Sequence, residues 1–63
     1  MDWDVCTMNG IKIGTYTSTG ENVPNVILAK DLDGKEFLFS IKTKDSAANK
    51  LFGQPTKRQP NAK

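Results

Sequence analysis

The chain of 63 residues contains no histidine, and Cys6 is its only cysteine. A structural zinc site normally needs four cysteine or histidine ligands, so the sequence argues against one. One cysteine cannot form a disulfide within the chain, and it fits a reducing compartment. No serine, threonine or cysteine stands near an identifiable base, so we expect a protein that is not an enzyme and that holds no metal and no cofactor.

Long apolar runs are also missing. The longest one covers residues 26–29, which is far shorter than the roughly 20 residues that a membrane-spanning helix needs. The N-terminal residues are acidic and lack the basic and apolar regions of a secretory signal peptide. These observations predict a cytoplasmic protein without membrane contact.

A strong β-hairpin signal covers residues 26–43. An Asp-Gly dipeptide at positions 33–34 stands between two apolar runs, and it favours a two-residue type I′ turn with positive φ at both positions. In the second arm Phe37, Phe39 and Ile41 fall on one face and polar residues fall mostly on the other. This period of two is typical of a strand with one buried face.

A second hairpin is predicted near the N-terminus. An Asn-Gly dipeptide at positions 9–10 separates a strand-like stretch, residues 3–7, from residues 11–19, which are rich in strand-forming residues. Gly14 lies inside the latter stretch, and an interior glycine indicates a bulge or a sharp bend. Residues 20–25 have the composition of a loop and connect the two hairpins.

The pattern changes near the C-terminus. Residues 45–52 lose the period of two, begin with an aspartate and a serine that can cap a helix, and precede Gly53, which can end one. This predicts a short helical turn that covers one opening of the sheet. Residues 54–63 contain two prolines, three basic residues and one small apolar residue, so we expect a disordered basic tail after a domain of residues 1–53.

Two hairpins and a helical turn predict a mainly β fold. We expect a small four-stranded antiparallel sheet that is strongly bent or forms an SH3-like barrel. A small α+β domain with a flat sheet and one helix is the alternative. The predicted core consists of Trp3, Val5, Ile11, Ile13, Val26, Leu28, Phe37, Phe39, Ile41, Leu51 and Phe52.

Charge is distributed unevenly along the chain. Residues 1–41 contain three lysines and six acidic residues, whereas residues 42–63 contain six basic residues and one acidic residue. This asymmetry suggests either an anionic partner or a solubilising tail. Lysines beside an aromatic ring on a curved sheet are typical of small barrels that bind nucleic acid. The candidate nucleic-acid contacts are Lys12, Tyr16, Lys42, Lys44, Lys57 and Arg58.

A protein partner is the interpretation that we favour over a nucleic acid. Leu38 falls on the polar face of its strand, and with Trp3 it predicts a small exposed apolar spot of the kind that anchors an interface. The strand of residues 3–7 is expected to be an open sheet edge, which can recruit a partner strand.

The sequence therefore predicts a small non-enzymatic binding module that regulates or inhibits a larger macromolecule by protein–protein contact. Binding of nucleic acid through a lysine-bearing sheet face and the basic tail is the alternative. Because a domain of 63 residues has a small core, self-association into a homodimer is also compatible with the sequence.

Overall fold

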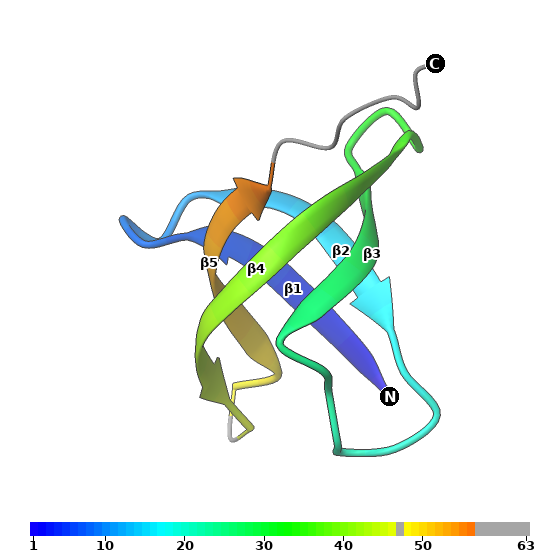
Figure 1. Cartoon of the computed structure of the whole chain (residues 1–63), viewed down its shortest axis with the longest axis vertical. Coiled ribbons are helices and arrows are strands. Elements are labelled where there is room, and N and C mark those ends of the chain that lie inside the picture. Colours follow the sequence, from blue (N-terminus) through cyan, green and yellow to red (C-terminus); the bar gives the residue numbers. More distant parts are fainter. Residues whose placement is uncertain (47, 57–63) are drawn as a thin grey trace.

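Five consecutive strands make up most of the computed structural model, which describes residues 1–46 and 48–56. The strands are β1 (Asp2–Thr7), β2 (Lys12–Thr17), β3 (Val26–Asp31), β4 (Glu36–Asp45) and β5 (Lys50–Thr56). Each strand pairs with the next in the sequence, and β5 pairs with β1, so the sheet closes into a barrel (Figure 1). The fold is a small mainly β barrel, compatible with the predicted SH3-like barrel, but it has five strands instead of four.

The closing pair differs from the others in direction. Consecutive strands of the barrel are antiparallel, so the first and the fifth of them run the same way. β1 and β5 therefore close the barrel as a parallel pair, in which Val5 lies beside Leu51 and Cys6 beside Phe52. Because β1 is paired on both sides, the open edge predicted for residues 3–7 is wrong.

The turn between β3 and β4 is a three-residue loop. The amide of Gly34 donates to the Asp31 carbonyl at 3.0 Å, and the amide of Asp31 donates to the Lys35 carbonyl at 2.8 Å. Gly34 has φ 86°, as the sequence predicts, but Asp33 is not among the residues with positive φ. The loop is thus a type I turn followed by a left-handed glycine, and the predicted type I′ turn is wrong.

The turn between β1 and β2 has the same construction. The amide of Gly10 donates to the Thr7 carbonyl at 2.8 Å, and the amide of Thr7 donates to the Ile11 carbonyl at 2.9 Å. Gly10 has φ 87°. Two Xaa-Gly dipeptides therefore produce two hairpins of the same type.

The turn type decides which residues of β3 are buried. A two-residue turn at positions 33–34 would place Leu28 opposite Phe39, on the buried face. The observed loop shifts the pairing by one residue, so that Ile27 lies opposite Phe39 and Leu28 lies opposite Leu38. A shift of one residue moves every side chain of a strand to the other face. The side of β3 that faces the core is consequently the opposite of the predicted one.

The core contains one tryptophan, one phenylalanine and several aliphatic residues. Its buried members are Trp3, Val5, Ile27, Ala29, Phe39 and Leu51, and the partly buried residues packed against them are Ile13, Tyr16, Val23, Phe37 and Ile41. Three residues of the predicted core are instead exposed: Ile11 at 62%, Val26 at 48% and Leu28 at 47%. The predicted buried face of β4 is confirmed, because Phe39 is fully buried and Phe37 and Ile41 pack against the core. Phe37 and Phe39 meet edge to face with ring centroids 6.2 Å apart.

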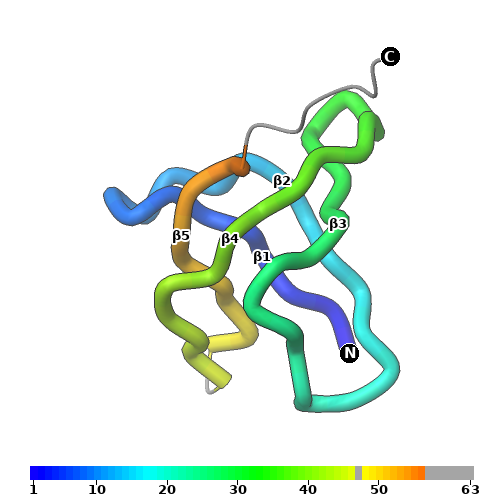
Figure 2. The backbone as a smooth tube through the Cα atoms, viewed as in Figure 1, coloured from blue at the N-terminus to red at the C-terminus, as the bar shows by residue number. Residues whose placement is uncertain are grey.

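The strands of the barrel are strongly curved (Figure 2), and two glycines, Gly14 and Gly53, lie near shifts of the strand register. The β1–β2 register shifts beside Gly14, which confirms the bulge predicted there, and the β4–β5 register shifts near Gly53. A Cβ atom on Gly14 would overlap the Lys30 carbonyl oxygen, and one on Gly53 would overlap the Ser40 carbonyl oxygen. Both positions therefore need a residue without a side chain.

The helical turn predicted for residues 45–52 is wrong, since the described residues contain no helix. The capping interaction that suggested it is nevertheless present. Asp45 Oδ1 accepts a hydrogen bond from the Ala48 amide at 3.3 Å, and Asn49 then takes a left-handed conformation with φ 53°. These contacts reverse the chain direction in one tight turn and lead it into β5, because an aspartate stabilises the first amides of a turn as it does those of a helix.

β5 also includes the first three residues of the predicted tail, residues 54–56. Residues 57–63, which contain the rest of that tail with Lys57 and Arg58, lie outside the described residues. In residues 1–46 and 48–56 there is no helix with the length and apolar character to cross a bilayer.

The left-handed glycine of the β3–β4 loop gives a first prediction. Gly34→Val should lower the free energy of unfolding by about 1–3 kcal/mol, because a β-branched residue is strained at positive φ. Gly20→Val is the matched control, since Gly20 has open space around it and no positive φ, and it should change stability by less than about 0.5 kcal/mol. Urea denaturation measures the stability of both variants. Equal unfolding midpoints for the two would contradict the left-handed conformation of Gly34 in this loop.

The facing of β3 gives a second prediction. Ile27 is 3% exposed and Leu28 is 47% exposed, so these neighbours form a matched pair. Ile27→Ala should cost about 2–4 kcal/mol, because it leaves a cavity beside Phe39, whereas Leu28→Ala should cost less than about 1 kcal/mol. A larger loss for Leu28→Ala in thermal or urea unfolding would show that the register is the one of a two-residue turn.

Candidate binding surface

Three aliphatic side chains lie together on the outer face of β3 and β4. Leu28 stands directly opposite Leu38, and Val26 lies two residues before Leu28 on the same face of β3. Val26 and Leu28 are about half exposed, and Leu38 is half-buried. We call these three residues the β3–β4 patch. A cleft of about 320 Å³ borders it, lined by Leu28, Glu36, Phe37, Leu38 and Thr56.

The apolar spot predicted for Trp3 and Leu38 is wrong, because Trp3 belongs to the core. Its side chain is 1% exposed. The indole Nε1 donates to Ser18 Oγ at 3.2 Å, and the Ser18 hydroxyl in turn donates to the Gly20 carbonyl. The ring is thus buried with its one polar group satisfied. Leu38 does reach the surface, and its apolar neighbour there is Leu28.

The lysines proposed as nucleic-acid contacts are not brought together on one face. Lys12 lies on β2, and its Nζ pairs with Asp4 Oδ1 at 3.4 Å. Lys42 and Lys44 lie on β4, which is not adjacent to β2 in the barrel. Lys44 Nζ donates to the Glu21 carbonyl at 3.0 Å. Lys57 and Arg58 lie outside the described residues.

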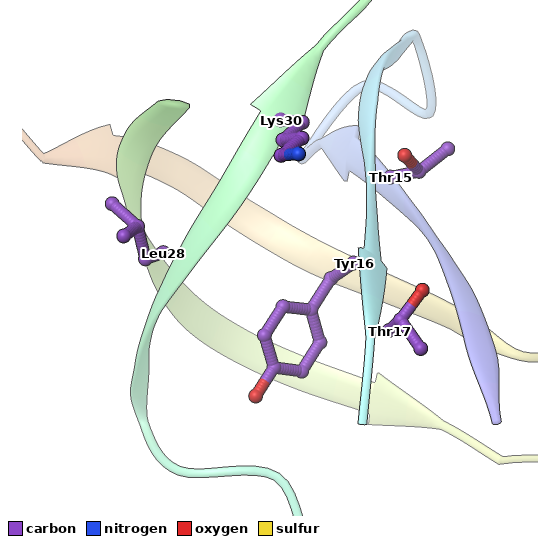
Figure 3. Close-up of a pocket in the computed structure, with 5 residues that line it drawn as sticks. All are labelled: Thr15, Tyr16, Thr17, Leu28 and Lys30. Carbon is purple, nitrogen blue, oxygen red and sulfur yellow. The ribbon is translucent and has the colours of Figure 1, made fainter. Parts of the chain in front are cut away.

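Tyr16 lines a cleft between β2 and β3, close to Lys30. The bulge at Gly14 precedes it, and its pairing partner on β1 is Trp3, so its ring lies on the core side of the sheet and is half-buried. Figure 3 shows the ring pointing away from β2 on the side where β3 lies. The cleft has a volume of about 250 Å³ and is lined by Thr15, Tyr16, Thr17, Leu28 and Lys30. We call it the β2–β3 seam.

The seam exists because the β2–β3 ladder is short. It contains two residue pairs, Gly14 with Asp31 and Thr15 with Lys30, and no further pair within the described part of the chain. Toward the end of β2 and the start of β3 the two strands are not paired. Both nevertheless remain paired on their other sides, to β1 and β4.

Backbone groups of β3 point into the seam. Hydrogen-bonded and non-hydrogen-bonded pairs alternate along an antiparallel ladder. The β3–β4 ladder has hydrogen-bonded pairs at its two ends, Asp31 with Lys35 and Asn25 with Ile41. Alternation between these ends directs the N–H and C=O groups of Val26 and Leu28 away from β4 and toward β2.

The same alternation holds on β2. Ser18 and Met1 form a hydrogen-bonded pair, in which the Ser18 amide donates to the Met1 carbonyl at 2.9 Å and the terminal ammonium donates to the Ser18 carbonyl at 2.6 Å. The neighbouring Thr17 therefore directs its N–H and C=O away from β1 and toward the seam. Thr17 and Leu28 would form the next hydrogen-bonded pair of the β2–β3 ladder, two residues beyond Thr15 and Lys30, but the ladder ends at Thr15 and Lys30.

Val26 and Leu28 are surface residues that the sequence analysis assigned to the core, and Lys30 is a lining residue that it did not identify. Val26 and Leu28 were expected in the core because residues 26–29 are all apolar and show no alternation. The signal that places them outside is the three-residue loop at Gly34, which sets the register.

Among residues 1–46 and 48–56, no cluster of three or more acidic, cysteine or histidine side chains is placed to hold a metal ion.

No family model, no curated protein and no solved structure matches this chain. What the surface does is therefore inferred from its geometry alone.

Amide hydrogen exchange checks the open seam. The Leu28 amide points into the seam, whereas the Ala29 amide belongs to the ladder with β4. We expect the Leu28 amide to exchange at least about tenfold faster than the Ala29 amide, after correction for intrinsic rates, because only the latter needs the ladder to open. Exchange can be followed residue by residue in NMR spectra of ¹⁵N-labelled protein. Equal protection of the two amides would show that the seam is closed.

Proposed function

We propose that this protein is a small non-enzymatic binding module that contacts another protein through the β3–β4 patch. The observation that carries the proposal is the direct pairing of Leu28 with Leu38 on the outer face, next to the half-exposed Val26. Single exposed aliphatic residues are common on protein surfaces, but three on neighbouring strands form a continuous apolar area.

The surroundings of the patch support a protein partner. Polar residues pair with or follow its members: Glu36 lies opposite Lys30, Ser40 opposite Val26, and Thr56 opposite Leu38. An apolar centre with a polar rim is the usual composition of a protein–protein interface. Because the patch itself consists of aliphatic side chains, its effect on a larger partner would be regulation or inhibition by occupying a surface.

Binding of nucleic acid has less support from the geometry. Lys12 lies on β2, whereas Lys42 and Lys44 lie on β4, which is not adjacent to β2. Lys12 and Lys44 already contact oxygen atoms of the chain. Tyr16, the aromatic residue of that hypothesis, is half-buried and has one face toward the core. A single partly covered ring is a small stacking platform for bases.

We further propose a cytoplasmic location, which suits the free thiol of Cys6.

Leu38→Asp tests the patch. It places a charge at the centre of the apolar area and should reduce capture of the partner by at least about tenfold. Thr43→Asp is the matched control, because it adds the same charge at an exposed position of the same strand, away from the patch. Each variant, immobilised after circular dichroism has shown that it folds, is incubated with nuclease-treated lysate of the source cells, and retained proteins are quantified.

The expected result is one stoichiometric protein retained by the wild type and by Thr43→Asp and lost with Leu38→Asp. Equal retention by all three would show that the patch is not the interface. Titration of fluorescent DNA and RNA at ~50 mM salt tests the alternative, since basic nucleic-acid binders show non-specific affinity under these conditions. Binding there, together with loss of every captured protein after nuclease, would favour nucleic acid.

A further inference from the structure

We propose that the β2–β3 seam binds an extended peptide segment of the partner protein, which pairs as an additional strand with the free side of β3. This inference rests on the proposed function, because it specifies how a partner would engage the face that carries the β3–β4 patch. Strand addition is a known mode of peptide recognition, in which main-chain hydrogen bonds give affinity and alternate side chains give specificity.

The backbone of β3 provides the hydrogen-bonding pattern that an extended chain requires. Leu28, which lines the seam, and Val26, two residues before it, each direct one N–H and one C=O to the side of β3 that faces away from β4. A partner strand presents the same alternating donors and acceptors with the same two-residue period. A phosphate backbone offers only acceptors and would leave the carbonyl oxygens of β3 without a partner.

The seam is held open by the rest of the fold. Residues 18–25 connect β2 to β3, and both ends of this loop are bonded to other strands. Ser18 is fixed to Met1 beside β1, while the Asn25 carbonyl accepts a hydrogen bond from the Ile41 amide of β4 at 2.7 Å. Beyond the short ladder, β2 thus stays paired with β1 and β3 stays paired with β4. The ladder between β2 and β3 therefore ends at Thr15 and Lys30. A pre-formed opening lowers the cost of ordering a ligand strand.

The lining of the seam predicts the side chains of the ligand. Residues of the added strand that point outward would continue the face of Leu28 and Leu38, so an aliphatic side chain fits there. Residues that point inward would meet the ring of Tyr16, which occupies the core side of the seam (Figure 3). The ligand is therefore an extended segment that alternates aliphatic residues on one face with small residues on the other.

A displayed library of random peptides of about ten residues, a length that covers a typical strand, provides the probe. Peptides enriched on the full-length protein are synthesised and their affinities measured by titration. We expect their binding to slow exchange of the Leu28 amide. Replacing successive peptide amides by N-methyl amides should weaken binding by at least about tenfold at every second position and little in between, because alternate amides face β3.

Two variants of Val26 separate backbone pairing from side-chain contact. Val26→Pro removes an N–H on the side of β3 that faces away from β4, at the first position of a strand, where proline is tolerated. Val26→Ala keeps that N–H and removes most of the side chain. Val26→Pro should bind the peptide at least about tenfold more weakly than Val26→Ala, because both variants lose the side chain that belongs to the β3–β4 patch and only the proline also loses the N–H. Circular dichroism and thermal unfolding confirm that both variants fold.

Other outcomes overturn the proposal in distinguishable ways. Strand addition is wrong if the library yields no binder. It is also wrong if every N-methyl substitution has the same effect on affinity and the two Val26 variants bind equally. Neither result contradicts the β3–β4 patch as the interface. If Leu38→Asp leaves capture of the partner unchanged, the proposed function itself fails. Protection of the Leu28 amide that rises with protein concentration would identify a second copy of the chain as the occupant. Protection by single-stranded DNA or RNA would identify a nucleic acid.

Discussion

Parallel pairing of β1 with β5 is the constraint on which the rest of the structure depends. Five strands that alternate in direction can form a ring only if the first and the last run the same way. The pair brings Val5 and Leu51 together, and neither has any exposed surface. With this ladder in place, every strand has two neighbours, which removes the open edges that small sheets otherwise expose. The ladder with the fewest residue pairs in the described ring is the one between β2 and β3, and the seam lies where this ladder ends.

Features that depend on a few neighbouring residues could be predicted from the sequence. The left-handed conformation of Gly34, the bulge at Gly14 and the shared buried face of Phe37 and Phe39 all follow from local patterns. Each reflects a restriction that acts within the chain segment itself: the steric freedom of glycine, or the alternation of side chains along a strand. The mainly β class and the barrel shape follow from these features in combination.

Features set by non-local geometry could not be predicted in the same way. Residues 26–29 are all apolar, so the face of β3 is fixed by the register, and the register depends on whether the loop has two or three residues. Residues 45–52 carry the local signals of a short helix, yet pairing with both β1 and β4 places residues 50–52 in β5. The candidate surface depends on both outcomes, because Leu28 becomes exposed through the register and the seam appears where a ladder ends.

Cys6 lies within the closing ladder, beside Phe52, and its thiol is buried at 4% exposure. The residues joined by this ladder, such as Asp4 and Lys50, are far apart in the sequence, so their pairing has a higher loop-closure cost than the hairpins have. The ring is therefore expected to close after the hairpins form and to open before they separate. A thiol reagent reaches Cys6 only during such an opening. When reclosing is faster than the reaction, the modification rate of this single cysteine follows the population of molecules whose ring is open.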